Sequence, residues 1–414
     1  MSATGVDYDT LIIGAGPAGL ALARALGARG LSVAVVERQP LEALQLPAFD
    51  GREIALTHRS ATMLRGLDAW DRIPAAEISP LGEARVLNGP SGHTIRFQPG
   101  GTTEEKLGYL VANHLIRRAL YEAAVACPNV RLLAGHACTG IETNRQSASL
   151  TLADGARITA RLVVAADTRF SETRRRMGIA ASMRDFGKTM MVCRMTHARP
   201  HHEVATEWFG YGQTIAMLPL NDAPDGAHVS SLVLTLPSRQ TERLLALDEV
   251  AFSAEITQRY EHRLGAMQLV STRHCYPLVG VYASRFVAER FALVGDAAVG
   301  MHPVTAHGFN FGLLSQHTLA GLMTGAAAAG RDIGAPLLLR RYQMLHRRAT
   351  RPLYLATNTT ALLYSDDRLP ARLLRNIGIR LGERLPPVRE AVVSKLMAGS
   401  SRRSRPSLLR ALVP

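Results

Sequence analysis

The chain has 414 residues, of which 47% are hydrophobic and 20% charged, and this composition is typical of a compact globular protein with a large core. Its length excludes a small accessory module, and no apolar run approaches the roughly 20 residues that a membrane-spanning helix needs. The net charge of +14 is uneven, because residues 331–414 contain 17 Lys and Arg against 5 Asp and Glu.

The start of the chain and its cysteines bear on the compartment. Asp7 and Asp9 lie where a signal peptide would carry basic residues, so export is not expected. The four cysteines show no C-x-x-C or other metal-binding spacing. Packed thiols in a reducing, cytoplasmic setting are the simplest interpretation.

The first predicted elements form a β-α-β unit. Tyr8–Ile13 is a short apolar run of strand length, residues 18–29 have the composition of a helix that Gly30 can close, and residues 32–37 form a second strand. This order is the beginning of a doubly wound parallel sheet.

A glycine loop joins the first strand to the first helix. The segment Gly14-Ala15-Gly16-Pro17-Ala18-Gly19 has the pattern G-x-G-x-x-G directly after a strand and at the opening of a helix, where that pattern is specific. Gly14 permits the tight turn, Gly16 lets the backbone approach a pyrophosphate, and Gly19 allows close packing of helix on strand. Free N–H groups at the helix N-terminus then bind the anion.

The end of the second strand carries an acidic residue. Glu37, followed by Arg38, is placed to accept hydrogen bonds from a ribose hydroxyl, which favours FAD or NAD over NADP at this site. A glycine loop with an incidental surface glutamate is the alternative interpretation.

Two later segments are predicted to join the same sheet as buried strands. Residues 161–166 run into Asp167, and residues 291–294 run into Gly295 and Asp296. Open α/β sheets bind ligands at the carboxyl ends of their strands. Asp296 can accept hydrogen bonds from a ribityl chain, and the helix start at residues 308–312 can present N–H groups to a reduced flavin ring.

The segments between these strands have a different pattern. Residues 84–98 predict a hairpin, and residues 188–236 alternate in the manner of antiparallel strands with polar loops. From residue 310 onward the pattern is helical, with basic amphipathic stretches that prolines interrupt beyond residue 369. The predicted fold class is α/β: a Rossmann-like FAD-binding parallel sheet, an inserted antiparallel sheet-rich substrate region and a C-terminal helical segment.

These patterns divide the chain into alternating parts. FAD-binding segments are predicted at 1–80, 101–180 and 281–330, the last of which contains the Gly-Asp pair. A substrate-region hairpin is predicted at 81–100, the antiparallel substrate region at 181–280 and the basic helical region at 331–414.

The motifs together resemble the class A flavoprotein aromatic hydroxylases, the para-hydroxybenzoate hydroxylase fold group, and within it the ubiquinone-biosynthesis hydroxylases. The likeness covers most of the chain. That family's R-x-x-A-L segment begins here at Arg52, its Y-x-V-x-N motif ends at Asn113, and its His-Pro precedes a Gly-x-Asn-x-Gly helix start at 308–312. The amino-acid sequence of residues 50–60 is most similar to that of the bacterial 5-demethoxyubiquinol hydroxylases.

The resemblance implies an FAD-dependent monooxygenase that hydroxylates the aromatic or quinol ring of a polyprenylated ubiquinone precursor. In the family, NAD(P)H reduces FAD, the reduced flavin reacts with O2 to a C4a-hydroperoxide, and the distal hydroxyl passes to the ring. The cofactor-binding residues that the motifs and the resemblance assign are Gly14, Ala15, Gly16, Pro17, Ala18, Gly19, Glu37, Arg38, Arg52, Asn113, Asp167, Gly295, Asp296, Gly308, Phe309 and Asn310.

Candidate catalytic and substrate residues follow from position. The candidate catalytic residues are His302, Pro303 and His307. The two histidines flank the expected flavin edge, where an imidazole can deprotonate a phenol, although hydrogen bonding to the loop backbone is the alternative. The candidate substrate contacts are Trp208, Phe209 and Met217. Core packing is the alternative for all three.

One departure from the family concerns the turn after the middle strand. The family usually has glycine after Ala-Asp, whereas this chain has Thr168 after Asp167. A β-branched residue disfavours positive φ. The turn, and the nicotinamide handling attributed to it in the family, are therefore expected to differ.

The basic C-terminal region indicates an anionic partner. Its mixture of arginines and leucines suits peripheral contact with an anionic inner-membrane surface, or with a quinone-biosynthesis complex, and the substrate partner is a polyprenylated phenol or quinol. An ordinary solvated helical face is the alternative, and no recognised nucleic-acid motif accompanies the charge. Two other functions stay open: another FAD oxidoreductase on this fold, such as a prenyl reductase or halogenase, and a non-catalytic flavin-binding scaffold.

Overall fold

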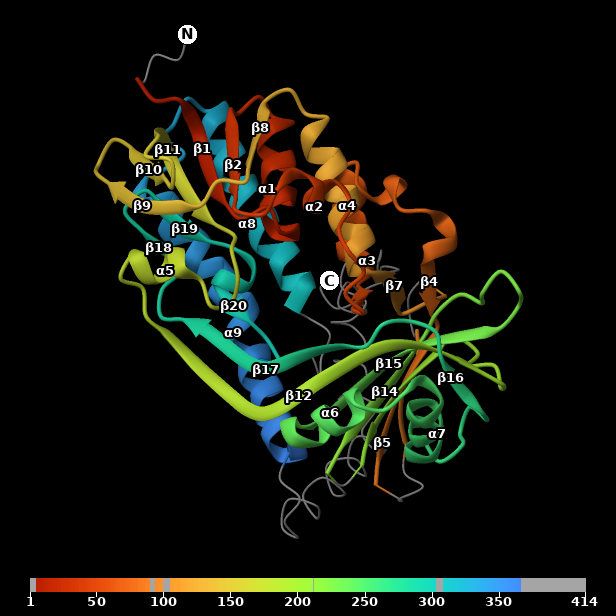
Figure 1. The fold of residues 1–414 in the computed structure, drawn as a ribbon. Helices are drawn as coiled ribbons and strands as arrows, with labels where there is room; N and C mark the ends of the chain where they lie inside the picture. Colours follow the sequence, from red (N-terminus) through yellow and green to blue (C-terminus); the bar gives the residue numbers. More distant parts are fainter. Residues whose placement is uncertain (1–4, 90–93, 100–104, 211, 303–307, 366–414) are drawn as a thin grey trace, which may run out of the picture.

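The structure is a computed structural model that describes residues 5–89, 94–99, 105–210, 212–302 and 308–365. Two large sheets dominate it, one mainly parallel and one mainly antiparallel (Figure 1). A third sheet of three strands has the order β3-β7-β4. Its strands are β3 (Glu53–Leu56), β4 (Ile78–Leu81) and β7 (Gly108–Ala112).

The parallel sheet contains the strands that the sequence predicted. Its order is β18-β19-β11-β1-β2-β8, and β10 and β9 extend it from β11. The bounds are β1 (Tyr8–Ile13), β2 (Val33–Glu37), β8 (Val130–Ala134), β9 (Cys138–Thr143), β10 (Ala148–Leu152), β11 (Arg157–Ala165), β18 (Val287–Ala288) and β19 (Phe291–Leu293). Strands β1, β2, β8, β11 and β19 pair in parallel, so the predicted doubly wound sheet is confirmed.

Helices cover this sheet because its strands are apolar on both faces. Helix α1 packs against α8 and α4. The helices are α1 (Pro17–Gly27), α2 (Leu41–Gln45), α3 (His58–Gly66), α4 (Asn113–Val125), α5 (Glu172–Arg176), α6 (Ser238–Leu245), α7 (Glu249–Arg259), α8 (Gly308–Ala328) and α9 (Pro336–Ser365). Short 3-10 turns lie at η1 (Trp70–Arg72), η2 (Ala75–Glu77) and η3 (Gly295–Ala297).

The antiparallel sheet has the order β20-β17-β12-β15-β14-β13-β5-β6, with β16 attached to β12. Its strands are β5 (Glu83–Asn88), β6 (Thr94–Phe97), β12 (Ala181–His197), β13 (Val204–Phe209), β14 (Thr214–Pro219), β15 (His228–Pro237), β16 (Met267–Leu269), β17 (His274–Ala283) and β20 (Val299–Gly300). The predicted hairpin at 84–98 is β5 and β6, and it joins this sheet through a parallel pairing of β5 with β13.

Side chains alternate across the antiparallel sheet. One face carries apolar residues such as Met191, Leu232 and Leu234, which pack with Phe252 and Ile256 of α7 into a separate core. The opposite face is turned toward the parallel sheet. Because alternate residues face opposite sides of a strand, the register of these strands decides which side chains reach that space.

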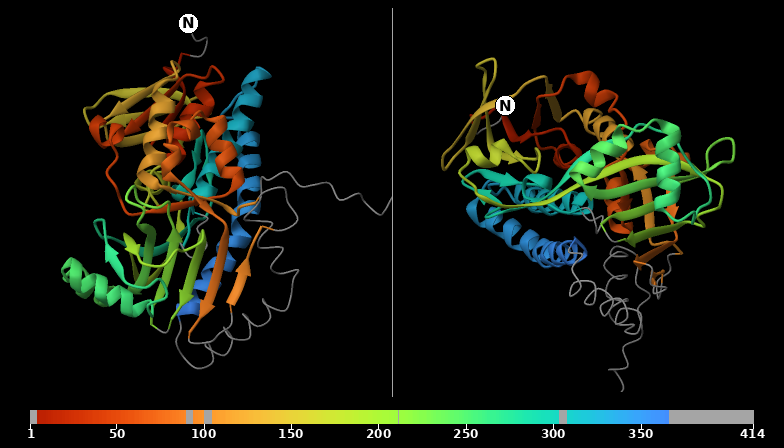
Figure 2. Two further views of the ribbon diagram at one scale, coloured as in Figure 1. Left: turned by 90° about the vertical axis from the view of Figure 1, so that its right-hand side faces the viewer. Right: turned by 60° about the horizontal axis from the view of Figure 1, so that its bottom comes forward.

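Helix α9 braces both sheets. The Tyr342 hydroxyl donates to the Leu293 carbonyl on β19 (2.6 Å), and Thr350 and Tyr282 on β17 share a hydrogen bond of 3.2 Å. The helix runs alongside the molecule in both further views (Figure 2). Within the described ranges, no helix is both long enough and apolar enough to cross a membrane. The predicted proline breaks beyond residue 369 lie outside the described residues.

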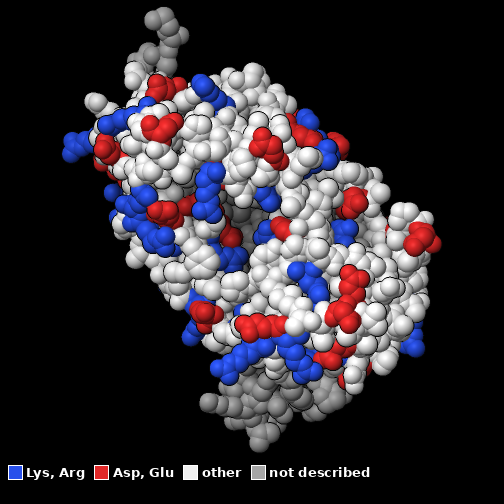
Figure 3. Space-filling model, viewed as in Figure 1, with Lys and Arg blue, Asp and Glu red and all other residues white. Residues whose placement is uncertain are grey.

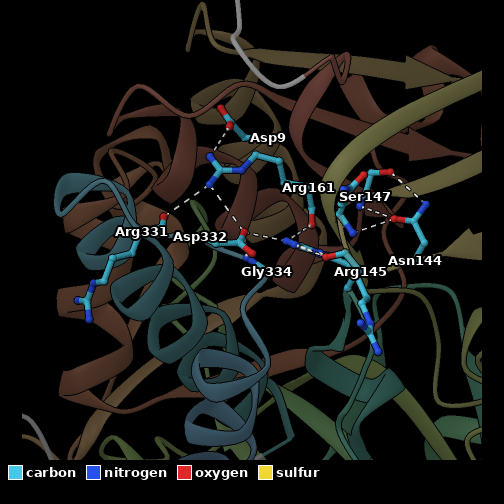
Figure 4. Close-up of polar contacts among 10 residues, drawn as sticks. Asp9, Asn144, Arg145, Ser147, Arg161, Arg331, Asp332 and Gly334 are labelled. Atoms are coloured by element: carbon cyan, nitrogen blue, oxygen red, sulfur yellow. Dashed lines mark hydrogen bonds and ion pairs between the residues drawn. The ribbon is translucent and has the colours of Figure 1, made fainter.

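A polar network fixes the segment that leads into α9. Arg161 on β11 contacts Asp9 on β1 (3.2 Å), the Arg331 carbonyl (3.5 Å) and Asp332 (3.7 Å) (Figure 4). The Gly334 N–H donates to Asp332 (3.0 Å). These contacts hold α9 against the edge of the parallel sheet opposite to the glycine loop.

Candidate functional site

A cavity of about 1110 Å³ lies where the carboxyl ends of the parallel strands face the antiparallel sheet. Figure 3, viewed as in Figure 1, shows a hollow near the middle of the surface, with acidic and basic residues around it. The volume exceeds the roughly 300–1,000 Å³ of pockets for small ligands, so the cavity can take a larger molecule.

Most residues predicted to bind a cofactor line this cavity. The lining includes Gly14, Ala15, Gly16, Pro17, Ala18, Glu37, Arg38, Arg52, Asn113, Asp167, Gly295, Asp296, Gly308 and Phe309. They come from segments far apart in the sequence, which the parallel sheet brings to one edge. Gly19 and Asn310 are not among the lining residues.

The glycine loop is shaped by close backbone packing. Gly14 has φ +105°, and a Cβ there would lie 2.7 Å from the Ala166 carbonyl oxygen. A Cβ on Gly19 would overlap with the Gly14 carbonyl, which explains why this glycine packs helix on strand and does not reach the cavity. At Gly16 the nearest atom would be 3.9 Å away, so the backbone is open to a ligand. The first N–H groups of α1 have no intrahelical acceptor and face this opening.

Glu37 is held beside the loop. Its carboxylate accepts from the Ala15 N–H (2.7 Å) and from the Gln39 N–H (2.9 Å). Its other lone pairs are available for a ribose hydroxyl, as predicted for an acid at the end of β2. Arg38, Arg117 and other arginines line the same end of the cavity, and their charge suits phosphate groups.

The Gly-Asp turn lies at the end of β19. Gly295 has φ +61°, and its N–H donates to the Ser315 hydroxyl (2.9 Å) on α8. Asp296 is paired with Arg169 (3.0 Å), whose second nitrogen donates to the Val279 carbonyl (3.1 Å). Arg169 therefore fixes the carboxylate that the sequence assigned to the ribityl chain.

Arg52 belongs to a partly buried polar cluster. Its guanidinium contacts Asp50 (2.6 Å), which also accepts from the Asn113 amide (2.7 Å), and it lies 5.2 Å from the centre of the Tyr276 ring. Burial acts to raise the pKa of Asp50, but the hydrogen bond and charge of Arg52 and the Asn113 hydrogen bond outweigh it and leave that pKa below its ordinary value. The pair is therefore ionised at neutral pH.

The start of α8 is tied to the segment after Arg52. The Asn310 side chain accepts from the Thr57 N–H (3.2 Å) and the Ser60 hydroxyl (2.6 Å), and it donates to the Ala55 carbonyl (2.9 Å). The Asn310 side chain therefore joins two protein segments, and its predicted cofactor contact, through the backbone N–H groups at the start of α8, stays a prediction. A Cβ on Gly308 would meet nothing within 4 Å, so the backbone there is open to the cavity.

The turn after β11 accommodates threonine. Thr168 is not among the residues with positive φ, and its carbonyl accepts from the Ser171 N–H (2.9 Å). The turn therefore accommodates this β-branched residue at an ordinary φ, and the expectation that nicotinamide handling differs from the family's stays a prediction. Burial raises the pKa of Asp167, and its Oδ1 atom has no hydrogen-bond partner among the described residues.

His302 lines the cavity and is buried, with its ring 4.7 Å from that of Phe186. Burial, with smaller effects from Lys188 and Arg169, lowers the pKa of His302 to about 4. The imidazole is neutral at neutral pH and is too weak a base to hold a phenol proton. Pro303 and His307, the other candidate catalytic residues, lie outside the described residues.

The three candidate substrate residues separate. Phe209 lines the cavity. Trp208 and Met217 are 6% and 2% exposed and belong to the core on the opposite face of the sheet. The expectation that these two residues face a ring substrate is wrong. Successive residues of a strand point to opposite faces, so Trp208, next to Phe209 on β13, and Met217, next to Ala216 on β14, point away from the cavity.

Sequence reasoning missed several cavity groups. Arg169 and Tyr276 line the cavity and hydrogen-bond Asp296 and the Asp50 carbonyl, which are distant from them in sequence. Glu53 is another: its side chain is 1% exposed and pairs with Arg194 (2.8 Å) on β12. Glu207 lines the cavity wall from β13. Strand alternation was the available signal for it, since a residue two before Phe209 shares its face.

The residues present fit a flavin dinucleotide. The open backbone at Gly16 and Gly308, the unpartnered Asp167 Oδ1 and the fixed carboxylates of Glu37 and Asp296 supply donors and acceptors along one continuous cavity. The glycine loop suits a pyrophosphate, and the Gly-Asp turn suits a polyhydroxyl chain.

Comparison with known proteins gives three related findings. The family model for the FAD binding domain matches residues 7–351. The chain is 45% identical over 392 residues to ubiquinone hydroxylase UbiM of Neisseria meningitidis, which covers 94% of this chain and 84% of the relative. It is 27% identical to 3-demethoxyubiquinol 3-hydroxylase of Escherichia coli, over 92% of this chain and 96% of the relative.

Among solved structures, PqsL of Pseudomonas aeruginosa in complex with 2-aminobenzoylacetate has a TM-score of 0.74 at 22% identity. The match covers 87% of this chain and 97% of that one. At this identity the likeness concerns the fold, and it agrees with the sheets and helices described above.

Proposed function

This chain belongs to the FAD binding domain family and is an FAD-dependent monooxygenase, and from that premise we propose that it hydroxylates the ring of a polyprenylated phenol or quinol precursor of ubiquinone. The observation that supports this most is the single cavity that joins the glycine loop, the Gly-Asp turn and the antiparallel sheet. One end suits a dinucleotide and the other presents a wall of apolar and hydroxyl-bearing side chains.

When bound, FAD supplies the redox chemistry through which NAD(P)H and O2 yield the added oxygen atom. The chain's own residues bind and orient. The N-terminus of α1 with Gly16 binds the pyrophosphate, Glu37 holds the ribose, and Asp296, fixed by Arg169, holds the ribityl hydroxyls. The backbone N–H groups at the start of α8 stabilise negative charge on the flavin ring.

Other cavity residues orient the ring and exclude water. Arg52, ionised and fixed by Asp50, places a positive charge on the cavity side of β3. Phe209 and its neighbours on the antiparallel sheet form the wall that shields the reaction from water. His302 borders the same space as a neutral group, and we assign it a hydrogen-bonding role.

The test is complementation in bacterial cells that lack each ubiquinone-ring hydroxylase in turn. Mass spectrometry of the accumulated quinone precursors is expected to show one restored hydroxyl when this chain is expressed. The matched control is Gly14→Ala, in which the flavin site is disrupted. No restored hydroxyl at any position would contradict the proposal, and a halogenated or prenyl-reduced product would replace it with another flavin chemistry.

We further propose that α9 rests on an anionic membrane surface. Its exposed apolar residues include Leu337 (79% exposed), Met344 and Leu355 (55% exposed). Met344 follows Leu337 by seven residues and Leu355 follows Met344 by eleven, so the three side chains align along one side of the helix. Arg341, Arg348 and other arginines lie on the same exposed surface. Ala361, near the end of the helix, is buried and lines the cavity, so one side of α9 borders the site while another carries the exposed apolar residues.

Vesicle co-sedimentation tests this docking. The FAD-loaded protein is expected to bind vesicles that contain anionic phospholipid, and binding should fall about 5-fold for each arginine replaced, as in Arg348→Ser. Leu337→Ser should also weaken binding, whereas Leu46→Ser, on α2's end and 72% exposed, is the matched control. Equal binding to uncharged vesicles, or none to either kind, would contradict the proposal and favour a protein complex as the partner.

A further inference from the structure

The cavity face of the antiparallel sheet carries one acidic side chain amid apolar and hydroxyl-bearing ones. Strand register places five residues side by side in one row: Val86, Glu207, Ala216, Val233 and Val192. The next row, two residues along each strand, contains Phe209, Thr214, Thr235, Met190 and Tyr276. Glu207 lines the cavity together with Ala216 and Val233 of its own row and Thr214 and Thr235 of the next row.

Glu207 has no compensating partner in the protein. Among the described residues, its carboxyl forms no hydrogen bond or ion pair, and its cross-strand neighbours Val86 and Ala216 are apolar. Glu53 differs, because Arg194 pairs with it. The Glu207 side chain is half-buried and lines the cavity. A carboxyl with no partner in the protein contributes nothing to the fold, so the group is available to a molecule in the cavity.

The charged and titratable groups near this wall are distant or paired. On β5, Arg85 is paired with Glu83. Lys188 on β12 and His274 and Tyr276 on β17 lie at least three strands from β13, which is about 14 Å at the usual spacing. With no nearby charge to offset it, burial raises the pKa of Glu207 to about 8. At neutral pH the group is mainly a neutral carboxylic acid, which both donates and accepts hydrogen bonds.

We propose that Glu207 is the specificity-determining residue that recognises a ring hydroxyl of the substrate by donating and accepting hydrogen bonds. This inference rests on the proposed function and deepens it. Phe209, in the neighbouring row, contacts the face or edge of the ring, while Glu207 fixes the ring's rotation in the cavity. A ring bound in one rotation presents one carbon to the flavin, so this contact also selects the carbon that is hydroxylated.

The test compares two ligands on the FAD-loaded enzyme: a phenol with a short prenyl chain and the methyl ether of the same phenol. Binding is followed by the change in the flavin absorption spectrum, without turnover. The wild type is expected to bind the phenol about 10-fold to 100-fold more tightly than the ether, because the ether leaves the carboxyl unpaired. In Glu207→Leu this preference should disappear.

A second variant separates recognition from packing. Glu207→Gln keeps a donor and an acceptor and should keep most of the preference. Glu203→Leu, in the turn before the same strand and outside the cavity, should keep all of it. A preference that survives in Glu207→Leu, or is lost in Glu207→Gln, overturns the inference. Equal binding of both ligands by the wild type overturns it but leaves the proposed function standing, whereas binding of neither ligand overturns both.

Discussion

The two large sheets recognise ligands in different ways. On the parallel-sheet side, recognition relies largely on the backbone: the main chain at Gly16 and Gly308 is open to the cavity, and the carboxylates of Glu37 and Asp296 lie beside it. The antiparallel sheet uses side chains, and only alternate residues of each strand reach the same cavity. Backbone recognition depends on glycine spacing and so is visible in the sequence, whereas side-chain recognition depends on strand register, which pairs residues far apart in the chain.

The largest expected effect is the loss of flavin binding when the backbone of the glycine loop is disturbed. Gly14→Ala should abolish flavin binding, because φ is +105° and the new Cβ would lie 2.7 Å from the Ala166 carbonyl oxygen; strain and overlap together cost about 3 kcal/mol or more. Flavin absorbance per mole of purified protein measures the loss. Gly66→Ala, where a Cβ would meet nothing within 4 Å, is the control and should bind flavin normally. A yellow Gly14→Ala protein would show that backbone packing does not govern the site.

The next effect concerns the ion pair that links the three-stranded sheet to the antiparallel sheet. Arg194→Leu leaves the Glu53 carboxyl, whose side chain is 1% exposed, without its partner, and should lower the free energy of unfolding by about 3 kcal/mol. Denaturant titration measures the change. The double variant Glu53→Leu with Arg194→Leu should regain most of the loss, because it removes both buried charges. Equal stability of the double and single variants would mean that the loss comes from packing around Arg194.

The pH dependence of protein stability tests the environment of Glu207 on the antiparallel sheet. Burial raises the pKa of Glu207 to about 8, while an unfolded glutamate titrates near about 4.3. Between these values the folded chain holds the proton and the unfolded chain does not. The stability from this site is therefore complete below about pH 4 and is lost as pH rises through about 8.

Glu207→Gln removes this pH dependence. Its Tm should match that of the wild type near about pH 4 and exceed it by roughly 5 °C near about pH 9. Glu53, whose pKa burial raises to about 7 despite Arg194, contributes a similar slope that both proteins retain. Parallel Tm curves for the two proteins across this range would contradict the burial assigned to Glu207.

The smallest effect tests alternation itself. Met217→Leu changes a residue on the core face, so it should change the free energy of unfolding by about 1 kcal/mol at most and leave KM for the ring substrate within about 2-fold. Phe209→Leu, on the cavity face, should raise KM with a comparably small change in stability. Kinetics and denaturant titration of both variants decide this. A raised KM in Met217→Leu would indicate that the ligand contacts the core face of the antiparallel sheet, which contradicts the assignment of the cavity face.

Much of the fold and of the cofactor site was predictable for this reason. The strand Tyr8–Ile13 is confirmed, and the loop that starts at Gly14 lies beside the cavity, as local patterns predicted. The Gly-Asp turn followed from a strand with an acid at its carboxyl end. Such features need only short-range information, because one strand and one turn set their conformation.

The rest required long-range pairing. Trp208 and Met217 were attractive as ring contacts, but the register of β13 with β14 turns both into the core. Asn310 joins two segments more than 250 residues apart, which no local pattern reveals. Glu207 was overlooked because its significance lies in the absence of neighbouring charge among the described residues, a property of the packed sheet.

The most direct test of the central claim, that one cavity holds both flavin and ring, is the origin of the added oxygen. Purified enzyme with FAD, NAD(P)H and a short-chain prenylated phenol would be incubated under O2 enriched in a heavy isotope, and the product weighed by mass spectrometry. We expect a product heavier by one oxygen atom that carries the isotope of the gas. A product whose oxygen comes from water, or NAD(P)H oxidation with no oxygenated product, would contradict the account.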